Sequence, residues 1–428
     1  MTNADTFAWR SIALPAFLPT LLFSLGEGAV IPIIPIVADS LGATLAIAGL
    51  IAAMITVGAV VGDIPSGWLV SRVGERASMI GAAGVAVIGL GAATIAPNPW
   101  VLGFAILLIG IATAVFALAR HAFMTTFVPL RYRARALSTL GGTFRLGFFV
   151  GPFIAAGVIH LTGSTSAVFI VHIIGCLGAA AVLLVLRDPG ATFGNRVNAS
   201  PSEGSTISPD ASAAEMSVTA GRRFVEDESR GLFATIARHR GVLARLGTGA
   251  ALIGGIRASR AVILPLWAVS IGISGTNTAI IIGIAGAVDF ALFYASGQIM
   301  DRFGRLWSAV PSMVGLGTGL IVLAASVTLP ARDIWFIAVA IFLSLANGIG
   351  SGILMTLGAD LADPGNPAPF LGAWRFTGDL GGAGAPVLVA VVTAVSSLAV
   401  ASGVIGILGL LGAGILLRYL PRYAPHRR

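Results

Sequence analysis

Hydrophobic residues follow one another in long stretches along most of the chain, and short polar or Gly/Pro-containing segments separate them. Twelve stretches are long enough for a helix of about 20 residues, the length that crosses a bilayer. Short connections such as Pro97-Asn98-Pro99 and Gly163-Ser164-Thr165 predict hairpins between antiparallel helices. We predict helices at 14–37, 47–70, 77–96, 100–128, 136–162, 166–186, 243–271, 277–299, 306–329, 333–361, 369–394 and 397–420.

The composition agrees with this pattern. Charged residues make up 10% of the 428 residues, whereas soluble proteins contain about 25%. Hydrophobic residues make up 56%, and the 56 glycines show no Gly-X-Y period. A single cysteine, Cys176, excludes a disulfide scaffold. We therefore predict an all-α membrane protein with twelve transmembrane helices, embedded in the lipid bilayer.

The positive charges give an orientation. All cationic side chains are arginine, and the net charge is +8. Most arginines of the short loops and tails fall on one side of the predicted topology, whereas the loops of the opposite side carry Arg332 alone. Because positively charged loops stay in the cytoplasm, we place both termini there, in a bacterial plasma membrane. No basic soluble domain is present, so nucleic acid is not an expected partner. The loops and tails of the positive side contain Arg10, Arg72, Arg76, Arg131, Arg133, Arg135, Arg302, Arg305, Arg418, Arg422, Arg427 and Arg428.

The longest polar segment divides the predicted spans into six and six. We predict an N-terminal six-helix bundle over 1–186, a cytoplasmic linker over 187–242 and a C-terminal six-helix bundle over 243–428. The Ser-, Pro- and Ala-rich part of the linker, 200–217, is expected to be disordered. The part from 222 to 240 alternates charged and apolar residues in the manner of an amphipathic helix on the membrane surface.

The two halves resemble each other at an offset of 230 residues. Pro35 matches Pro265, and Arg145 matches Arg375. Gly42, Gly67, Arg72, Gly74 and Gly142 match the glycines or arginines 230 positions later. Two six-span halves of one polarity predict parallel repeats, which place a substrate site near the middle of the membrane between them.

A motif in the loop after the eighth span repeats in the first half. The second-half copy consists of Gly297, Asp301, Arg302, Gly304 and Arg305. It is similar to the G-x-x-x-D-R-x-G-R signature of the major facilitator superfamily, and the resemblance extends over nearly the whole chain. It implies that fold and a cluster that holds the cytoplasmic face closed in one state. In the first-half copy, Ser71 stands where the signature has an acid; that copy consists of Gly67, Ser71, Arg72, Gly74 and Arg76.

The fifth span carries a second motif, formed by Gly147, Gly151 and Pro152. It resembles the G-x-x-x-G-P-x-x-G motif of the drug:proton antiporters in that superfamily, with Ala155 and Ala156 in the region of the last glycine. Small residues four apart also allow two helices to pack closely. Export and simple close packing are therefore both compatible with this motif.

Two carboxylates in the middle of spans are candidates for proton coupling, because charge within a membrane is costly and usually functional. Glu27 lies between Gly26 and Gly28 in the first span, and Asp289 is central in the eighth. The repeat places Glu27 opposite Arg257 in sequence. A permanent ion pair between Glu27 and Arg257 is the competing structural interpretation for Glu27, and an equivalent structural role is open for Asp289.

Arginines within the spans are candidates for a central cavity. Arg257 and Arg260 are three residues apart, so they share a helix face. They could bind an anionic substrate or neutralise Glu27 and Asp289. Arg375 and Asp379 are four apart, as in an intrahelical ion pair. The remaining cavity candidates are Arg120 and Arg145.

Taken with the resemblance, these residues predict a proton-coupled secondary transporter that exports small amphipathic compounds by alternating access. The alternative is uptake or exchange of a small organic anion held by the arginines of the seventh span. We expect protons and a small-molecule substrate as partners, a monomer, and neither a metal nor a cofactor. The sequence has one cysteine, five scattered histidines and no H-E-x-x-H or G-x-S-x-G motif, which argues against an enzyme.

Overall fold

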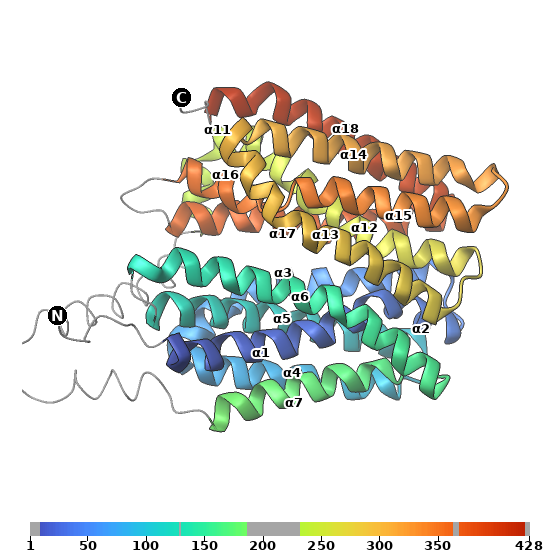
Figure 1. Ribbon diagram of the computed structural model, residues 1–428, viewed down its shortest axis with the longest axis horizontal. Coiled ribbons are helices and arrows are strands. Elements are labelled where there is room, and N and C mark those ends of the chain that lie inside the picture. Colours follow the sequence, from blue (N-terminus) through green and yellow to red (C-terminus); the bar gives the residue numbers. More distant parts are fainter. Residues whose placement is uncertain (1–8, 128–129, 186–231, 363–367, 424–428) are drawn as a thin grey trace, which may run out of the picture.

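The computed structural model describes residues 9–127, 130–185, 232–362 and 368–423. Within these ranges the regular elements are helices, which run roughly parallel and antiparallel to one another (Figure 1). The helices of the first half occupy one side of the molecule, and those of the second half occupy the other.

The described residues of the first half form seven α-helices and one 3-10 turn. The elements are α1 (Trp9–Val30), η1 (Ile31–Ile33), α2 (Ile34–Ser40), α3 (Leu45–Val73), α4 (Glu75–Thr94), α5 (Pro99–Phe127), α6 (Leu130–Thr162) and α7 (Val168–Val185). The first span combines α1, η1 and α2, because Pro32 and Pro35 interrupt the regular hydrogen-bond pattern of an α-helix.

From residue 232 onward, the described chain has a short helical segment, which is the end of the predicted linker, followed by six spans. The elements are α10 (Leu232–Arg238), α11 (Arg240–Val242), η2 (Leu243–Gly247), α12 (Thr248–Ser270), α13 (Gly275–Phe303), α14 (Leu306–Ala325), η3 (Ser326–Thr328), α15 (Arg332–Ile349), α16 (Ile353–Leu361), α17 (Ala368–Val395) and α18 (Leu398–Tyr423).

Twelve helices in the described residues are long and apolar enough to cross a membrane. Their ends lie within four residues of the predicted ends, so the prediction of twelve spans is confirmed. The predicted ends at 128 and 186 fall outside the described residues. The tenth span differs from the single helix predicted over 333–361. It is broken into α15 and α16 by a turn at 350–352, where Gly352 has a φ of +80°.

Both ends of the described chain lie at the same end of the molecule (Figure 1). We call this end, where α1 begins and α18 ends, the terminal face, and the opposite end the far face. Because the spans alternate in direction, α3 and α13 run toward the terminal face, whereas α6 and α17 run away from it.

The internal repeat extends to the ends of helices. α3 and α13 each contain 29 residues and start 230 residues apart. Thr44 and Ser274 cap them by accepting a hydrogen bond from the backbone N–H three residues later. Both helices stop at a glycine, Gly74 with φ +92° and Gly304 with φ +93°. With ψ near 160°, this backbone conformation is one that essentially only glycine adopts.

The two halves meet through matching pairs of helices. α3 packs against α17, and α6 packs against α13, while α12 contacts α2 and α3. The other extensive contacts, such as α3 with α5 and α14 with α18, stay within one half. The second and fifth spans of each half therefore form the joint between them.

Only the end of the predicted 187–242 linker belongs to the described residues, since 187–231 lie outside them. The described end is helical, and α10 packs against α17. Thr235 is buried, and the ring of His239 meets Phe370 edge-on at 5.2 Å between ring centroids.

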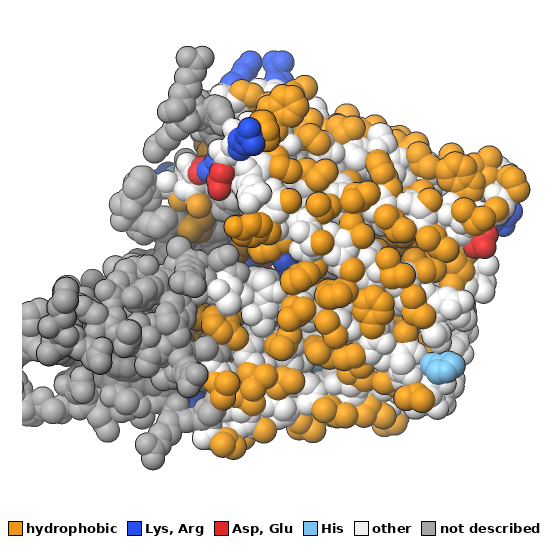
Figure 2. Space-filling view, in the orientation of Figure 1, with side chains coloured by type: hydrophobic (Ala, Val, Ile, Leu, Met, Phe, Trp, Pro, Cys, Tyr) orange, Lys and Arg blue, Asp and Glu red, His pale blue; other side chains and the backbone are white. Residues whose placement is uncertain are grey.

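The outer surface is largely apolar. Hydrophobic side chains cover most of the face in Figure 2, and charged side chains lie mainly toward its two ends. Trp68 and Trp307 are exposed near the terminal face, and Trp100 and Trp335 are exposed near the far face. Tryptophan is enriched at the two membrane–water interfaces, so this arrangement is typical of a membrane-spanning protein.

Candidate functional site

Glu27 lies in the middle of the first span with its side chain 5% exposed. Its neighbours on α1 have no side chains, which brings other helices close. A Cβ on Gly26 would lie 2.5 Å from the Cα of His172 on α7, and one on Gly28 would lie 2.8 Å from the Cα of Phe148 on α6. The sequence Gly-Glu-Gly thus encloses the carboxylate between α6 and α7.

The Glu27 carboxylate is not fully hydrogen-bonded. Its Oε2 atom has no hydrogen-bond partner in the structure. The positive charge that acts on it is Arg120 of α5, in the same half. Arg257, the expected partner across the repeat axis, interacts instead with Asp289. The repeat gives matching positions in the two halves, but matching positions need not face each other.

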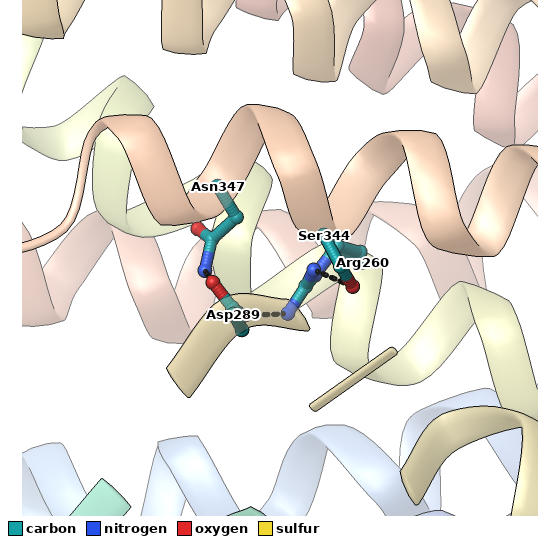
Figure 3. A network of polar contacts seen from close by, with 4 residues as sticks. All are labelled: Arg260, Asp289, Ser344 and Asn347. Carbon is teal, nitrogen blue, oxygen red and sulfur yellow. Dashed lines mark hydrogen bonds and ion pairs between the residues drawn. The ribbon is translucent and has the colours of Figure 1, made fainter. Parts of the chain in front are cut away.

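Asp289 belongs to a polar network in the second half (Figure 3). Its Oδ2 forms an ion pair with Arg260 at 2.8 Å. Asn347 donates to both carboxylate oxygens, at 2.8 and 2.7 Å, and Arg260 also donates to Ser344. The network joins α12, α13 and α15 and compensates the Asp289 charge. These direct contacts support a structural role for Asp289.

Arg257 is directed at the broken tenth span. It donates to the backbone carbonyl of Gly350, at 2.6 Å, and this carbonyl lies in the turn between α15 and α16. The Arg257 Nε has no hydrogen-bond partner. The two arginines of the seventh span are thus largely occupied within the second half.

Aromatic rings line the joint between α6 and α13. The Arg145 guanidinium lies 4.4 Å from the ring centroid of Phe293, a cation–π contact between the halves. Phe149 stacks on Phe290 at 5.7 Å between centroids. Within the first half, Arg120 lies 5.0 Å from the ring of Phe144.

Arg375 forms the intrahelical pair that the spacing indicated, at 3.3 Å from Asp379. It also reaches across the joint to Asp63 on α3, at 3.6 Å. Asp63 lies eight residues before Ser71 in the same span. Its role as a contact between the halves was not predicted.

The two copies of the loop motif lie at the terminal face and make different contacts. Arg305 binds Asp360 at the end of α16, with N–O distances of 2.7 and 3.3 Å. This hydrogen bond raises the pKa of the Arg305 guanidinium above its ordinary value. Arg76 donates to the backbone carbonyl of Leu183 on α7. Each copy thus fastens helices within its own half.

Ser71, Arg72 and Arg302 lie in the last turns of α3 and α13, and they make local contacts there. Ser71 donates its hydroxyl hydrogen bond to the backbone carbonyl of Trp68, whose ring lies under the Arg72 guanidinium. Arg302 lies 5.3 Å from the ring of Phe303.

The fifth-span motif lies where α6 crosses α1. A Cβ on Gly147 would collide with Ser24, and one on Gly151 would lie 2.5 Å from the backbone nitrogen of Ala29. Pro152 is buried in the same helix. Close packing therefore explains the small residues, and the motif holds α6 beside Glu27.

Two kinds of residue at the site were not predicted from the sequence. Ser344 and Asn347 are polar residues three apart in an apolar span, a spacing that could have drawn attention to them. The phenylalanines of α6 and α13 could not be separated from core residues by sequence, because aromatic rings at helical spacing usually only pack.

The fold and the buried charges define a polytopic helical membrane protein built from two related six-span halves. A family model described as the Major Facilitator Superfamily matches residues 16–386. The chain belongs to the Major Facilitator Superfamily.

Curated relatives match part of the chain. It is 25% identical over 172 residues to "Probable inositol transporter 3" of Arabidopsis thaliana, covering 38% of this chain and 30% of that protein. It is 27% identical over 149 residues to the "Galactose-proton symporter" of Escherichia coli K12, covering 35% of this chain and 32% of that protein. The chain thus matches about a third of the length of these relatives.

Solved structures match almost the whole chain. The xylose transporter XylE from E. coli, in a partially occluded inward-open conformation, has a TM-score of 0.69 and 16% identity, covering 96% of this chain and 99% of that one. A POT family transporter in complex with a thioalcohol-conjugated peptide has a TM-score of 0.75 and 12% identity, with 97% of both chains covered. These similarities show the fold.

Proposed function

We propose that this protein is a proton-coupled secondary transporter of a small organic solute, in which the two halves rock about a central site. The observation that carries the proposal is the buried Glu27 carboxylate with an oxygen that lacks a hydrogen-bond partner. The unpartnered Oε2 atom is free to take up a proton, and acids within a membrane commonly serve in proton relays. Asp289 is the less suitable proton carrier, because Arg260 and Asn347 already compensate its charge.

The family and the names of the relatives support coupling to protons. The Escherichia coli relative is named as a galactose-proton symporter, and one structural neighbour is named as a D-xylose-proton symporter. We further propose that both termini face the bacterial cytoplasm, because arginines concentrate in the loops of the terminal face.

The direction of transport has two candidates. Export of amphipathic compounds rests on the resemblance of Gly147, Gly151 and Pro152 to the antiporter motif, although close packing also explains these residues. Uptake together with protons rests on the names of the relatives. The variant of uptake in which Arg257 and Arg260 bind an anion has less support, because Arg260 is paired with Asp289.

The test is solute flux in proteoliposomes under an imposed pH gradient. The panel contains galactose, xylose, myo-inositol, lactate and ethidium, so that sugars, a small organic anion and an amphipathic cation are all represented. We expect the gradient to drive accumulation of one solute class and a proton ionophore to abolish it. The sign of the gradient that drives accumulation gives the direction. If the flux of every transported solute is independent of the pH gradient, the proposal is wrong.

A further inference from the structure

The joint between the halves consists of two contacts that the internal repeat relates. One is α3 against α17, and the other is α6 against α13. At the first, Arg375 lies between Asp63 and Asp379. The repeat mates of Arg375, Asp63 and Asp379, 230 positions away, are Arg145, Phe293 and Phe149, respectively. These mates lie at the second contact.

The arginine is therefore common to both contacts, but its surroundings differ. Arg145 meets the ring of Phe293, at 4.4 Å, and Phe149 lies one helical turn further along α6. Aromatic rings do not titrate. The α3–α17 contact has carboxylates at the same two positions. The carboxylate that acts on Arg145 from α13 is Asp289, which is already paired with Arg260.

The carboxylates of the α3–α17 contact outnumber their cation. Asp63 and Asp379 share one guanidinium, with N–O distances of 3.6 and 3.3 Å. The side chains of Asp63, Arg375 and Asp379 are 22%, 40% and 41% exposed, so none of the three is fully enclosed by protein. Among the described residues of this contact, two carboxylates on one guanidinium sum to one net negative charge, and adding a proton removes it.

In the part of the chain that the structure describes, few charged groups surround Asp63. Arg375 and Asp379 face it from α17. Arg120 and His121 on α5, which also packs against α3, act on the same cluster through Arg375. The charged residues of the other helices that contact α3 either interact with Asp289 or lie at one of the two faces.

Those other charges can be placed individually. Arg257 and Arg260 of α12 interact with Asp289. Asp39 of α2 lies at the far face, and Glu75 with Arg76 of α4 lies at the terminal face.

We propose that Asp63 is a second proton-coupling residue, distinct from Glu27, whose protonation releases α3 from α17. This inference rests on the proposed proton-coupled transport. A proton on the Asp63 carboxylate removes the charge that attracts Arg375. Arg375 then remains with Asp379, its neighbour on the same helix, as a neutral pair. The α6–α13 contact has phenylalanines at the two equivalent positions, so the equivalent residues there cannot act in this way.

Asp63 lies ten residues from the end of α3 at the terminal face. Release of this contact therefore separates the halves on the terminal side. By linkage, a proton that favours the separated state is bound more tightly in that state. Asp63 thereby ties the opening of the terminal face to the proton that drives transport.

The experiment measures a distance across the terminal face in the full-length chain reconstituted in nanodiscs. Val73 and Phe303 are repeat mates at the ends of α3 and α13, and each is 53% exposed. Spin labels on Val73→Cys and Phe303→Cys, in a Cys176→Ser background, report their separation by double electron–electron resonance. We expect the population with the longer distance to grow as the pH falls.

The variants separate the possible causes. Asp63→Asn and, from the other side of the contact, Arg375→Gln should each give the long distance at every pH. Asp379→Asn should retain a pH response, because Asp63 and Arg375 remain. Phe293→Leu, at the repeat mate of Asp63, should also retain the response, because it removes no titratable group.

Two outcomes decide the inference. If both Asp63→Asn and Arg375→Gln keep the wild-type pH response, or if Glu27→Gln abolishes that response, Asp63 is not the residue involved. Neither result affects the solute-flux test of the proposed function. Conversely, gradient-independent flux would refute proton-coupled transport even if the distance still followed the pH through Asp63.

Discussion

At the scale of single residues, Glu27 shows how a polar group becomes enclosed in an apolar helix. Gly26 and Gly28 admit the backbones of α6 and α7, so the carboxylate is surrounded by protein although only one residue in the segment is charged. Burial without a full set of hydrogen bonds is costly. We therefore expect a function for this group.

Replacing Glu27 with glutamine tests that function directly. A difference of one pH unit is worth about 1.4 kcal/mol, and thus about tenfold accumulation for one proton per solute. We expect this accumulation in the wild type and none in Glu27→Gln, because glutamine has nearly the same shape but carries no proton. The measurement is gradient-driven solute uptake into proteoliposomes.

The control is Glu75→Gln, which removes an acid at the terminal face. It should accumulate solute as the wild type does. Undiminished accumulation by Glu27→Gln would remove this residue from the coupling mechanism.

The sequence identifies candidate charges better than it identifies their partners. Glu27 and Asp289 were recognisable as acids in apolar spans, and the Arg375–Asp379 pair follows from a spacing of one helical turn. The partners Arg120 for Glu27 and Asp63 for Arg375 lie on other helices. Those pairings depend on how the helices are rotated and tilted, which no local spacing contains.

At the scale of helices, long apolar stretches bounded by Gly, Pro or charge were sufficient to place the twelve spans, because the membrane sets their length. The interruptions were harder to predict. The turn between α15 and α16 follows glycines that, in so glycine-rich a chain, also occur inside unbroken helices. Arg257 binds the carbonyl exposed at this turn, a partner that is distant in sequence.

The crossing of α1 and α6 gives a prediction at this scale. A Cβ on Gly151 would meet the backbone of α1 at 2.5 and 2.6 Å, from Ala29 and Leu25. We expect Gly151→Val to destabilise the protein by about 1–3 kcal/mol, because the helices must move apart. Thermal unfolding in detergent measures the effect.

Gly157→Val is the matched control on the same helix, since a Cβ there meets nothing within 4 Å. Its unfolding temperature should stay close to that of the wild type. Equal losses in the two variants would mean that the effect comes from valine in a helix and not from the crossing.

At the scale of the molecule, alternating access requires the halves to part at one face and then at the other. Near the far face, a Cβ on Gly275 of α13 would lie 3.1 Å from Cγ2 of Thr165 in the first half. We expect a disulfide between Gly275→Cys and Thr165→Cys to stop solute flux, because it fixes the far face closed. Reduction should restore the flux.

A disulfide within one half controls for oxidation. A Cβ on Gly403 would lie 3.8 Å from that of Ala324, so Gly403→Cys with Ala324→Cys should cross-link and continue to transport. The native Cys176 is buried and should not interfere. Unimpaired flux with the far face cross-linked would exclude movement of the halves at that face.

The exposed tryptophans fix how deep the molecule sits in its membrane. Trp68 is 23 residues beyond Leu45 along α3, about 35 Å at the rise of an α-helix, which is comparable to the hydrocarbon thickness of about 30 Å. Indole rings anchored at both interfaces resist vertical displacement, so a bilayer of unsuitable thickness must deform or tilt the helices. The activity of this protein should consequently depend on acyl-chain length, and its own indole fluorescence, quenched by brominated lipids, would report the mismatch.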